Sequence, residues 1–125
     1  MKLTIRLLSL TIVTALVAVM VFAAQDGVKQ VGSKHICFIT KKRFERNLKS
    51  VNVEGKTYYG CCDDCLAKLT NDPASRKDVD PVSGKEVDKA TAFIGMDKDG
   101  NVYFFESQEN LKKFRVPPAP PTGTR

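Results

Sequence analysis

The sequence has a single histidine, His35, and none of the motifs that mark the common catalytic sites. It lacks the H-E-x-x-H motif of metalloproteases and the glycine-rich loop that binds phosphate groups. No serine, histidine and acid occur in a recognisable catalytic context. One histidine and a group of cysteines give no pair of general acid and general base. We therefore predict that the chain is not an enzyme.

Long apolar runs are also scarce, with one near the N-terminus. Residues 7–22 are apolar apart from one serine and two threonines, basic residues precede them, and small and polar residues follow. This order is typical of a secretory signal peptide, and about 16 residues are fewer than the roughly 20 needed to span a bilayer. We predict a signal peptide over residues 1–23 and a periplasmic or secreted protein without a stable membrane span. An uncleaved anchor is the alternative.

Acidic residues are fewer than basic ones, 14 against 20, which gives a net charge of +6. Lys2 and Arg6 lie in the predicted signal peptide, which has no acidic residue, so cleavage lowers the charge to +4 (6 − 2). On an exported protein this surplus does not predict nucleic-acid binding, but suits an exported surface or contact with an anionic envelope component. The basic segment from Lys41 to Lys49 is interpreted as a solvated loop.

The remaining chain divides into short segments. We interpret residues 24–34 as a linker and residues 116–125 as a disordered proline-rich tail. Residues 49–53 and 57–59 predict a β-hairpin, and Asp63 begins a predicted helix that ends at Asn71-Asp72-Pro73. A core of this size often needs a metal ion or a disulfide for stability.

The second half repeats the first. Residues 57–69 align without gaps over residues 102–114, and residues 37–42 align over residues 80–85. Each half has an aromatic strand after a glycine-containing turn, and then an acidic helix start. The sequence therefore predicts an α+β fold, a small zinc-knuckle-like tandem of two β-hairpin-plus-helix units. The aromatic side chains of the strands are predicted to lie in the core.

Cysteines are the chain's most distinctive side chains. Three of the four fall within residues 61–65, and Cys37 lies upstream. Cys61 and Cys65 are four apart and are expected on one side of a helix start, with Cys62 either a fourth ligand or a free thiol. Thiolates grouped in this way bind soft metal ions such as Zn(II) or Cu(I). An even number of cysteines also allows disulfides in an exported protein, for example Cys37 to Cys65.

The cysteine spacing leads to a family. Cys37, a gap of 23 residues, and then Cys61-x-x-x-Cys65 at a strand-to-helix junction resemble a TRASH-type heavy-metal-binding domain over residues 35–78. Tyr58-Tyr59, Cys62 and Asp72-Pro73 are similar to bacterial relatives of the form C-P-V-T-G-K…Y-F-C-C-x-x-C…D-P. The resemblance implies heavy-metal binding through the cysteines.

The second half, residues 79–115, resembles a YHS domain. The segment from Asp80 to Lys85 is similar to the D-P-V-C-G-M opening of that family, and residues 103–105 to its aromatic strand. Ser83 replaces the opening cysteine, and Glu106 and Asn110 stand where the first half has Cys61 and Cys65. An oxygen site for a hard cation at Asp80, Glu106 and Asn110 is conceivable, but loss of the metal site is the favoured interpretation.

These observations predict an exported protein that holds or hands over Cu(I) or Zn(II) through Cys37, Cys61, Cys62 and Cys65, with another exported protein as a candidate partner. The alternative is a disulfide-stapled interaction module without metal. A thiol oxidoreductase using Cys62 and Cys65 would need a βαβ context that the pattern lacks. His35 is interpreted as an exposed residue without a role.

Overall fold

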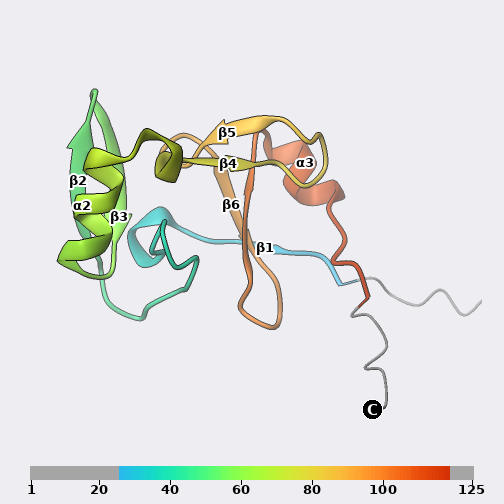
Figure 1. The fold of residues 1–125 in the computed structure, drawn as a ribbon. Coiled ribbons are helices and arrows are strands. Elements are labelled where there is room, and N and C mark those ends of the chain that lie inside the picture. The colour runs from blue at the N-terminus through green and yellow to red at the C-terminus, as the bar shows by residue number, and fades with distance from the viewer. Residues whose placement is uncertain (1–25, 119–125) are drawn as a thin grey trace, which may run out of the picture.

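The computed structural model describes residues 26–118, and these form a small α+β fold with several β-hairpins and two α-helices (Figure 1). The predicted signal peptide and residues 119–125 of the predicted tail lie outside the described residues. The elements run in the order β1 (Lys29–Gln30), η2 (Ser33–His35), β2 (Lys49–Val53), β3 (Lys56–Gly60), α2 (Asp63–Asn71), η3 (Pro73–Arg76), β4 (Lys77–Val79), β5 (Glu86–Asp88), β6 (Phe93–Met96), β7 (Val102–Phe105) and α3 (Gln108–Lys113), where η marks a 3-10 turn.

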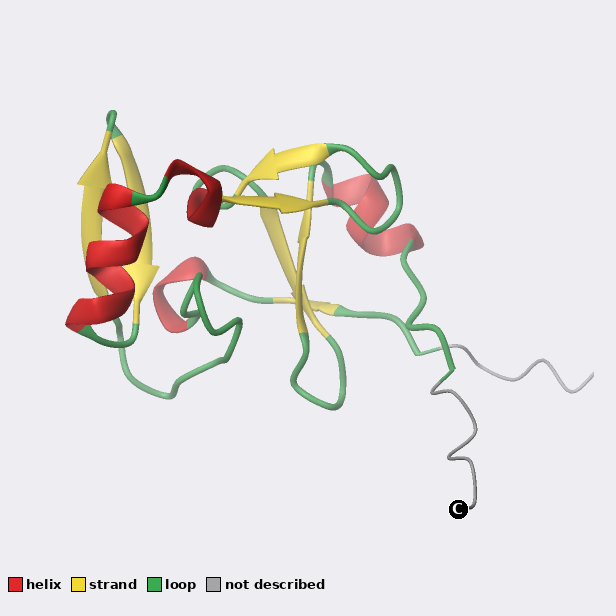
Figure 2. Cartoon of the chain, in the orientation of Figure 1, coloured by secondary structure: helices red, strands yellow, loops and turns green. Residues whose placement is uncertain are grey.

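The first hairpin and its helix lie where the sequence predicts them. β2 pairs antiparallel with β3, with Lys49 opposite Gly60 and Val53 opposite Lys56. The turn needs two residues at positive φ, Glu54 at 53° and Gly55 at 77°, and the glycine adopts this conformation at little cost. α2 then lies across the hairpin and buries Leu69 against it (Figure 2).

In the second half, the hairpin of β6 and β7 belongs to a three-stranded sheet in the order β1-β6-β7. β6 pairs antiparallel with β7, and α3 follows with Leu111 buried in a cluster with Phe105 and Phe114. β1 comes from the segment predicted as a linker, where Lys29 pairs with Met96 and Gln30 with Gly95. Gly95 is required here, because a Cβ atom at this position would lie 2.7 Å from a methyl group of Val28.

The two halves share one hydrophobic core. It contains Ile36, Phe38, Tyr58 and Leu69 from the first half and Val87, Ile94, Val102 and Phe104 from the second. The ring of Phe38 is fully buried and makes edge-to-face contacts with Tyr58, Tyr59 and Phe104. The strand aromatics Tyr58 and Phe104 are therefore core residues, as the sequence predicts.

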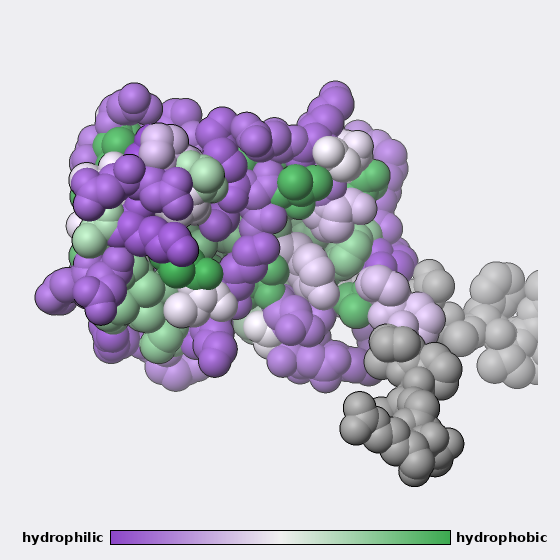
Figure 3. Space-filling model, in the orientation of Figure 1, coloured by the Kyte–Doolittle hydropathy of each residue, from purple (hydrophilic) through white to green (hydrophobic). Residues whose placement is uncertain are grey.

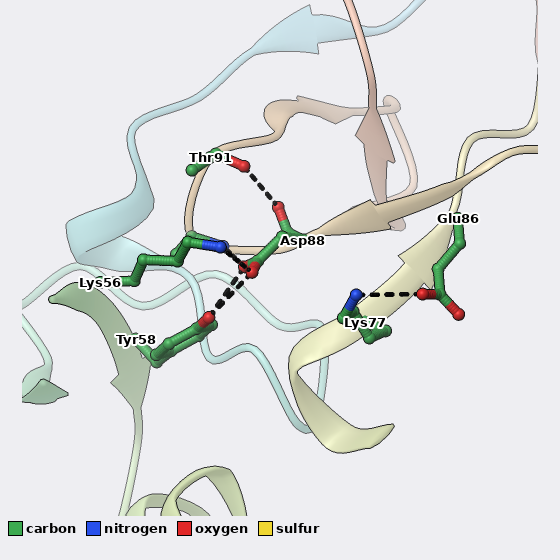
Figure 4. Close-up of polar contacts among 7 residues, drawn as sticks. Lys56, Tyr58, Lys77, Glu86, Asp88 and Thr91 are labelled. Atoms are coloured by element: carbon green, nitrogen blue, oxygen red, sulfur yellow. Dashed lines mark hydrogen bonds and ion pairs between the residues drawn. The ribbon is translucent and has the colours of Figure 1, made fainter. Parts of the chain in front are cut away.

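A polar contact ties the halves together at the β4–β5 hairpin, which spans the predicted boundary between residues 78 and 79. The carboxylate of Asp88 on β5 accepts hydrogen bonds from the Tyr58 hydroxyl, at 2.9 Å, and from the Lys56 ammonium, at 2.8 Å (Figure 4). Burial and the Asp88 hydrogen bond raise the pKa of Tyr58 to about 12. β3 is thus fixed to β5 through a neutral phenol and an ionised carboxylate.

The face of the molecule seen in Figure 3 is mainly hydrophilic, with apolar residues in small patches. The exposed large apolar side chains among residues 26–118 are Val79, Val82 and Phe93. No helix within the same range has the length and apolar character to cross a membrane.

Candidate metal centre

Three cysteines from different parts of the first half converge. Cys37 lies in the loop before β2, Cys61 directly follows β3, and Cys65 lies in the first turn of α2. Their Sγ atoms all lie within 4.8 Å of one another, and those of Cys61 and Cys65 are 3.7 Å apart. Such a group could hold a metal ion, and it is the single group of this kind among residues 26–118.

A tight loop places Cys37. Its amide donates to the Lys42 carbonyl at 3.0 Å, and its carbonyl accepts from the Lys41 amide at 2.9 Å. Lys41 has a φ of 54°, a left-handed conformation that closes the loop. The Thr40 amide points back at the Cys37 sulfur, with N and Sγ 3.5 Å apart. The loop therefore places the buried Cys37 sulfur next to the start of α2.

Gly60 brings the other two thiols together. A Cβ atom at this position would lie 3.1 Å from both the Cys65 Cβ and the Leu66 Cδ2. Such contacts are tighter than most real Cβ contacts, so the absence of a side chain lets the first turn of α2 approach the end of β3. Cys61 and Cys65 then lie on one side of the strand-to-helix junction, as their spacing predicts.

Cys62 lies at the edge of this group. It is the N-cap residue of α2, with extended φ and ψ of −148° and 169°, and its side chain makes no capping hydrogen bond. It is exposed and is not one of the three mutually close cysteines, yet its Sγ lies 3.3 Å from that of Cys65. The sequence left Cys62 as either a fourth ligand or a free thiol, and the structure places its sulfur beside that of Cys65 but outside the close group.

The thiols differ in acidity. Burial raises the pKa of Cys37, but hydrogen bonds led by Thr40 outweigh it and lower the pKa to about 7. Burial raises the pKa of Cys61 and of Cys65, and so do the hydrogen bonds that their neutral thiols donate to neighbouring sulfurs. Hydrogen bonds from Cys65 lower the pKa of exposed Cys62. A bound metal ion would hold the ligating sulfurs as thiolates, because coordination deprotonates a thiol outright.

Two basic side chains lie beside the candidate centre and bond to groups other than the thiols. The Arg46 guanidinium donates to the Cys61 carbonyl at 3.1 Å, and the Lys49 ammonium pairs with Asp63 at 2.9 Å. The ring of His35 donates through Nδ1 to the Arg46 carbonyl at 3.1 Å, since a carbonyl only accepts. His35 is therefore partly buried and hydrogen-bonded, and not the exposed residue that the sequence predicts.

A second polar cluster forms around Asp80, which is fully buried. One carboxylate oxygen accepts from the amides of Val82 at 2.7 Å and Ser83 at 3.2 Å. The other accepts from the Glu106 amide at 2.8 Å and the Asn110 side chain at 2.9 Å. Burial raises the pKa of Asp80, but these hydrogen bonds outweigh it and lower the pKa. Asp80, Glu106 and Asn110 are therefore together, joined by hydrogen bonds.

The loop at Asp80 has the same backbone hydrogen bonds as the loop at Cys37. The Asp80 amide donates to the Lys85 carbonyl at 2.9 Å, and the Gly84 amide donates to the Asp80 carbonyl at 2.8 Å. Gly84 has a φ of 72°, at the same offset from Asp80 as Lys41 from Cys37. Ser107 is the N-cap residue of α3, the position that Cys62 holds at α2.

Lys89 is a supporting residue that the sequence did not reveal. Its side chain is buried, and its ammonium donates to the carbonyls of Phe38 at 2.8 Å and Ser75 at 2.9 Å. Burial lowers the pKa of Lys89. A lysine in a polar segment gives no sequence signal of burial. Because Phe38 follows Cys37, this contact anchors the Cys37 loop of the first half to the second half.

Comparison of the chain with known protein families, with curated proteins and with solved structures finds no match.

Proposed function

We propose that this chain is an exported protein that binds a soft metal ion, Cu(I) or Zn(II), through Cys37, Cys61 and Cys65, and holds it or hands it to another exported protein. The observation that carries the proposal is the convergence of these three sulfurs within 4.8 Å. The resemblance to TRASH-type domains and the apolar run at the N-terminus support the metal and the export, respectively. The proposed role is binding, not catalysis.

The arrangement favours an exchangeable ion over a purely structural one. Structural zinc sites have four closed ligands, whereas three thiolates leave a position open to a further ligand. Cys62 lies at the rim, next to Cys65 but outside the close group, and we propose that it serves as an accessory thiol and not as the fourth ligand that the sequence also allows. Cys37 and Cys65 are buried, so the protein would shield most of the ion from solvent.

We also propose that the second half is a copy of the first in which hydrogen bonds replace the metal ion. The equivalent loops at Cys37 and Asp80 support this proposal, and so do the two hairpins that each lead into a helix. The places of the three cysteines are taken by Asp80, Glu106 and Asn110. The Asp80 carboxylate accepts hydrogen bonds from the Glu106 amide and from the Asn110 side chain. The second unit would then stay folded without metal and support the first, a role consistent with its resemblance to a YHS domain that has lost its cysteines.

The test is metal content and free-thiol content of the purified chain, measured on the wild type and on single Cys→Ser variants. We expect about one metal ion per chain for the wild type. Cys61→Ser and Cys65→Ser should lose it. Cys62→Ser removes one thiol outside the close group and is the matched control, expected to retain the metal.

Two results would contradict the proposal. If the wild type binds no Zn(II) or Cu(I) after reduction, the metal centre is not functional. If the protein from the exported fraction has no free thiol and no metal, the alternative of a disulfide-stapled interaction module is correct. The size of the precursor and of the mature chain, compared by mass spectrometry, tests the predicted cleavage after Ala23.

A further inference from the structure

We propose that Cys62 is a thiol–disulfide exchange site, and that its reaction with an external disulfide forms a Cys62–Cys65 disulfide and withdraws Cys65 from the metal centre. The inference deepens the proposed function and rests on it for the release of metal. Formation of the disulfide itself does not depend on a bound ion.

Accessibility selects Cys62 as the point of attack. Cys37 is 0% exposed and Cys65 is 7% exposed, whereas Cys62 lies exposed at the surface. An external disulfide must reach the attacking sulfur in line, so a buried thiol reacts slowly.

Proximity selects Cys65 as the second cysteine. The Cys62 and Cys65 sulfurs are 3.3 Å apart, closer than those of Cys61 and Cys65 at 3.7 Å. Cys61 is half-buried, and its carbonyl is bonded to the Arg46 side chain, which fixes its backbone. Cys62 precedes the first residue of α2, so its side chain has the freedom of a residue outside the helix.

The exchange proceeds in two balanced steps. The Cys62 thiolate attacks one sulfur of a disulfide R–S–S–R, forming a mixed disulfide and releasing the first R–S⁻. The Cys65 thiolate then attacks the Cys62 sulfur, forming the Cys62–Cys65 bond and releasing the second R–S⁻. The two cysteines lose two electrons and the external disulfide gains them. In the metal-free chain, the two released thiolates take up the protons that Cys62 and Cys65 give up.

The consequence is loss of one of the three metal ligands. An ion held by Cys37, Cys61 and Cys65 would keep two sulfurs after the reaction, so its affinity would fall. Reduction would restore the third ligand. The substrate class is a disulfide with an accessible sulfur, either on a small molecule or on an exported protein.

The experiment uses the purified, reduced chain loaded with Zn(II), which is redox-inert and so reports only on the ligands. Oxidised glutathione is added, zinc release is followed with a chromophoric chelator, and disulfides are mapped after alkylation and trypsin digestion. Cleavage at lysines separates Cys37, in residues 35–41, from the other cysteines, in residues 57–68. The wild type should release zinc as a disulfide forms within residues 57–68.

Two variants sharpen the assignment. Cys62→Ser should release zinc at least about tenfold more slowly, because the remaining thiols are less accessible. Cys61→Ser, assayed without metal, should still form the disulfide at about the wild-type rate. Equal zinc release by the wild type and Cys62→Ser, or a disulfide linking residues 35–41 to residues 57–68, would overturn the inference. If the wild type takes up no zinc, the metal proposal fails, and disulfide mapping on the metal-free chain still decides the exchange site.

Discussion

Replacing Asp80 by asparagine tests the idea that a hydrogen-bonded carboxylate holds the second half together. The change keeps the shape of the side chain but leaves one acceptor oxygen where the carboxylate has two. The two Asp80 carboxylate oxygens accept hydrogen bonds from four N–H donors, two donors to each oxygen. The side-chain amide introduced by Asp80→Asn would turn its NH2 group towards one of these pairs, where it meets donors instead of acceptors.

The magnitude follows from which donors can adjust. Asn110 can rotate its amide and present oxygen to the new NH2 group, whereas the Glu106 backbone amide cannot. The change therefore leaves about one buried donor unsatisfied, at about 1–3 kcal/mol, and converts the remaining hydrogen bonds from charged to neutral acceptors. We expect a loss of about 3 kcal/mol in the free energy of unfolding, or about 15 °C in Tm for a domain of this size.

The assay is urea unfolding of the metal-free chain at pH 7, followed by circular dichroism. Asp99→Asn is the matched control, because it removes the same charge from an exposed position and should change the free energy of unfolding by no more than about 0.5 kcal/mol. If Asp80→Asn lies within about 1 kcal/mol of the wild type, the Asp80 cluster does not stabilise the second half, and the reasoning above is refuted.

Three further outcomes are expected. The triple variant Asp80→Cys, Glu106→Cys and Asn110→Cys should raise the zinc content from about one to about two ions per chain, and a folded variant still binding one would contradict the duplicated site. The lowered pKa of Asp80 means that its contribution to stability is complete above about pH 4 and is lost as pH falls through the folded-state pKa, so urea midpoints should drop in that range by less in Asp80→Asn than in the wild type. Lys89→Met should cost about 2–4 kcal/mol in urea unfolding, because two buried carbonyls lose their donor, and an unchanged midpoint would show that the ammonium contributes nothing net.

Much of the site could be predicted because its signals are local. Alternation over residues 49–59 and the acidic start of α2 predicted the hairpin and the helix. The spacing of Cys61 and Cys65 predicted their shared side, and the single upstream cysteine was the remaining candidate for the third sulfur.

The features that sequence reasoning missed depend on contacts between distant segments. β1 forms in the predicted linker because β6 offers it a free edge, and no pattern within Lys29–Gln30 indicates this. The burial of Lys89 depends on two carbonyls from the other half. For Cys62 the sequence left two alternatives, a fourth ligand or a free thiol, because the bend at the N-cap that brings its sulfur close to that of Cys65 does not follow from the rule for extended chains.

The position of Phe38 has a consequence for engineering. Its ring contacts Tyr58 of the first half and Phe104 of the second half, and Phe38 directly follows Cys37 in the chain. A shortened peptide ending before β4 would keep all four cysteines but would expose this ring and leave its carbonyl without the ammonium that caps it. Transplanting the site into another scaffold would therefore require the entire folded body, and not the cysteine-bearing portion alone.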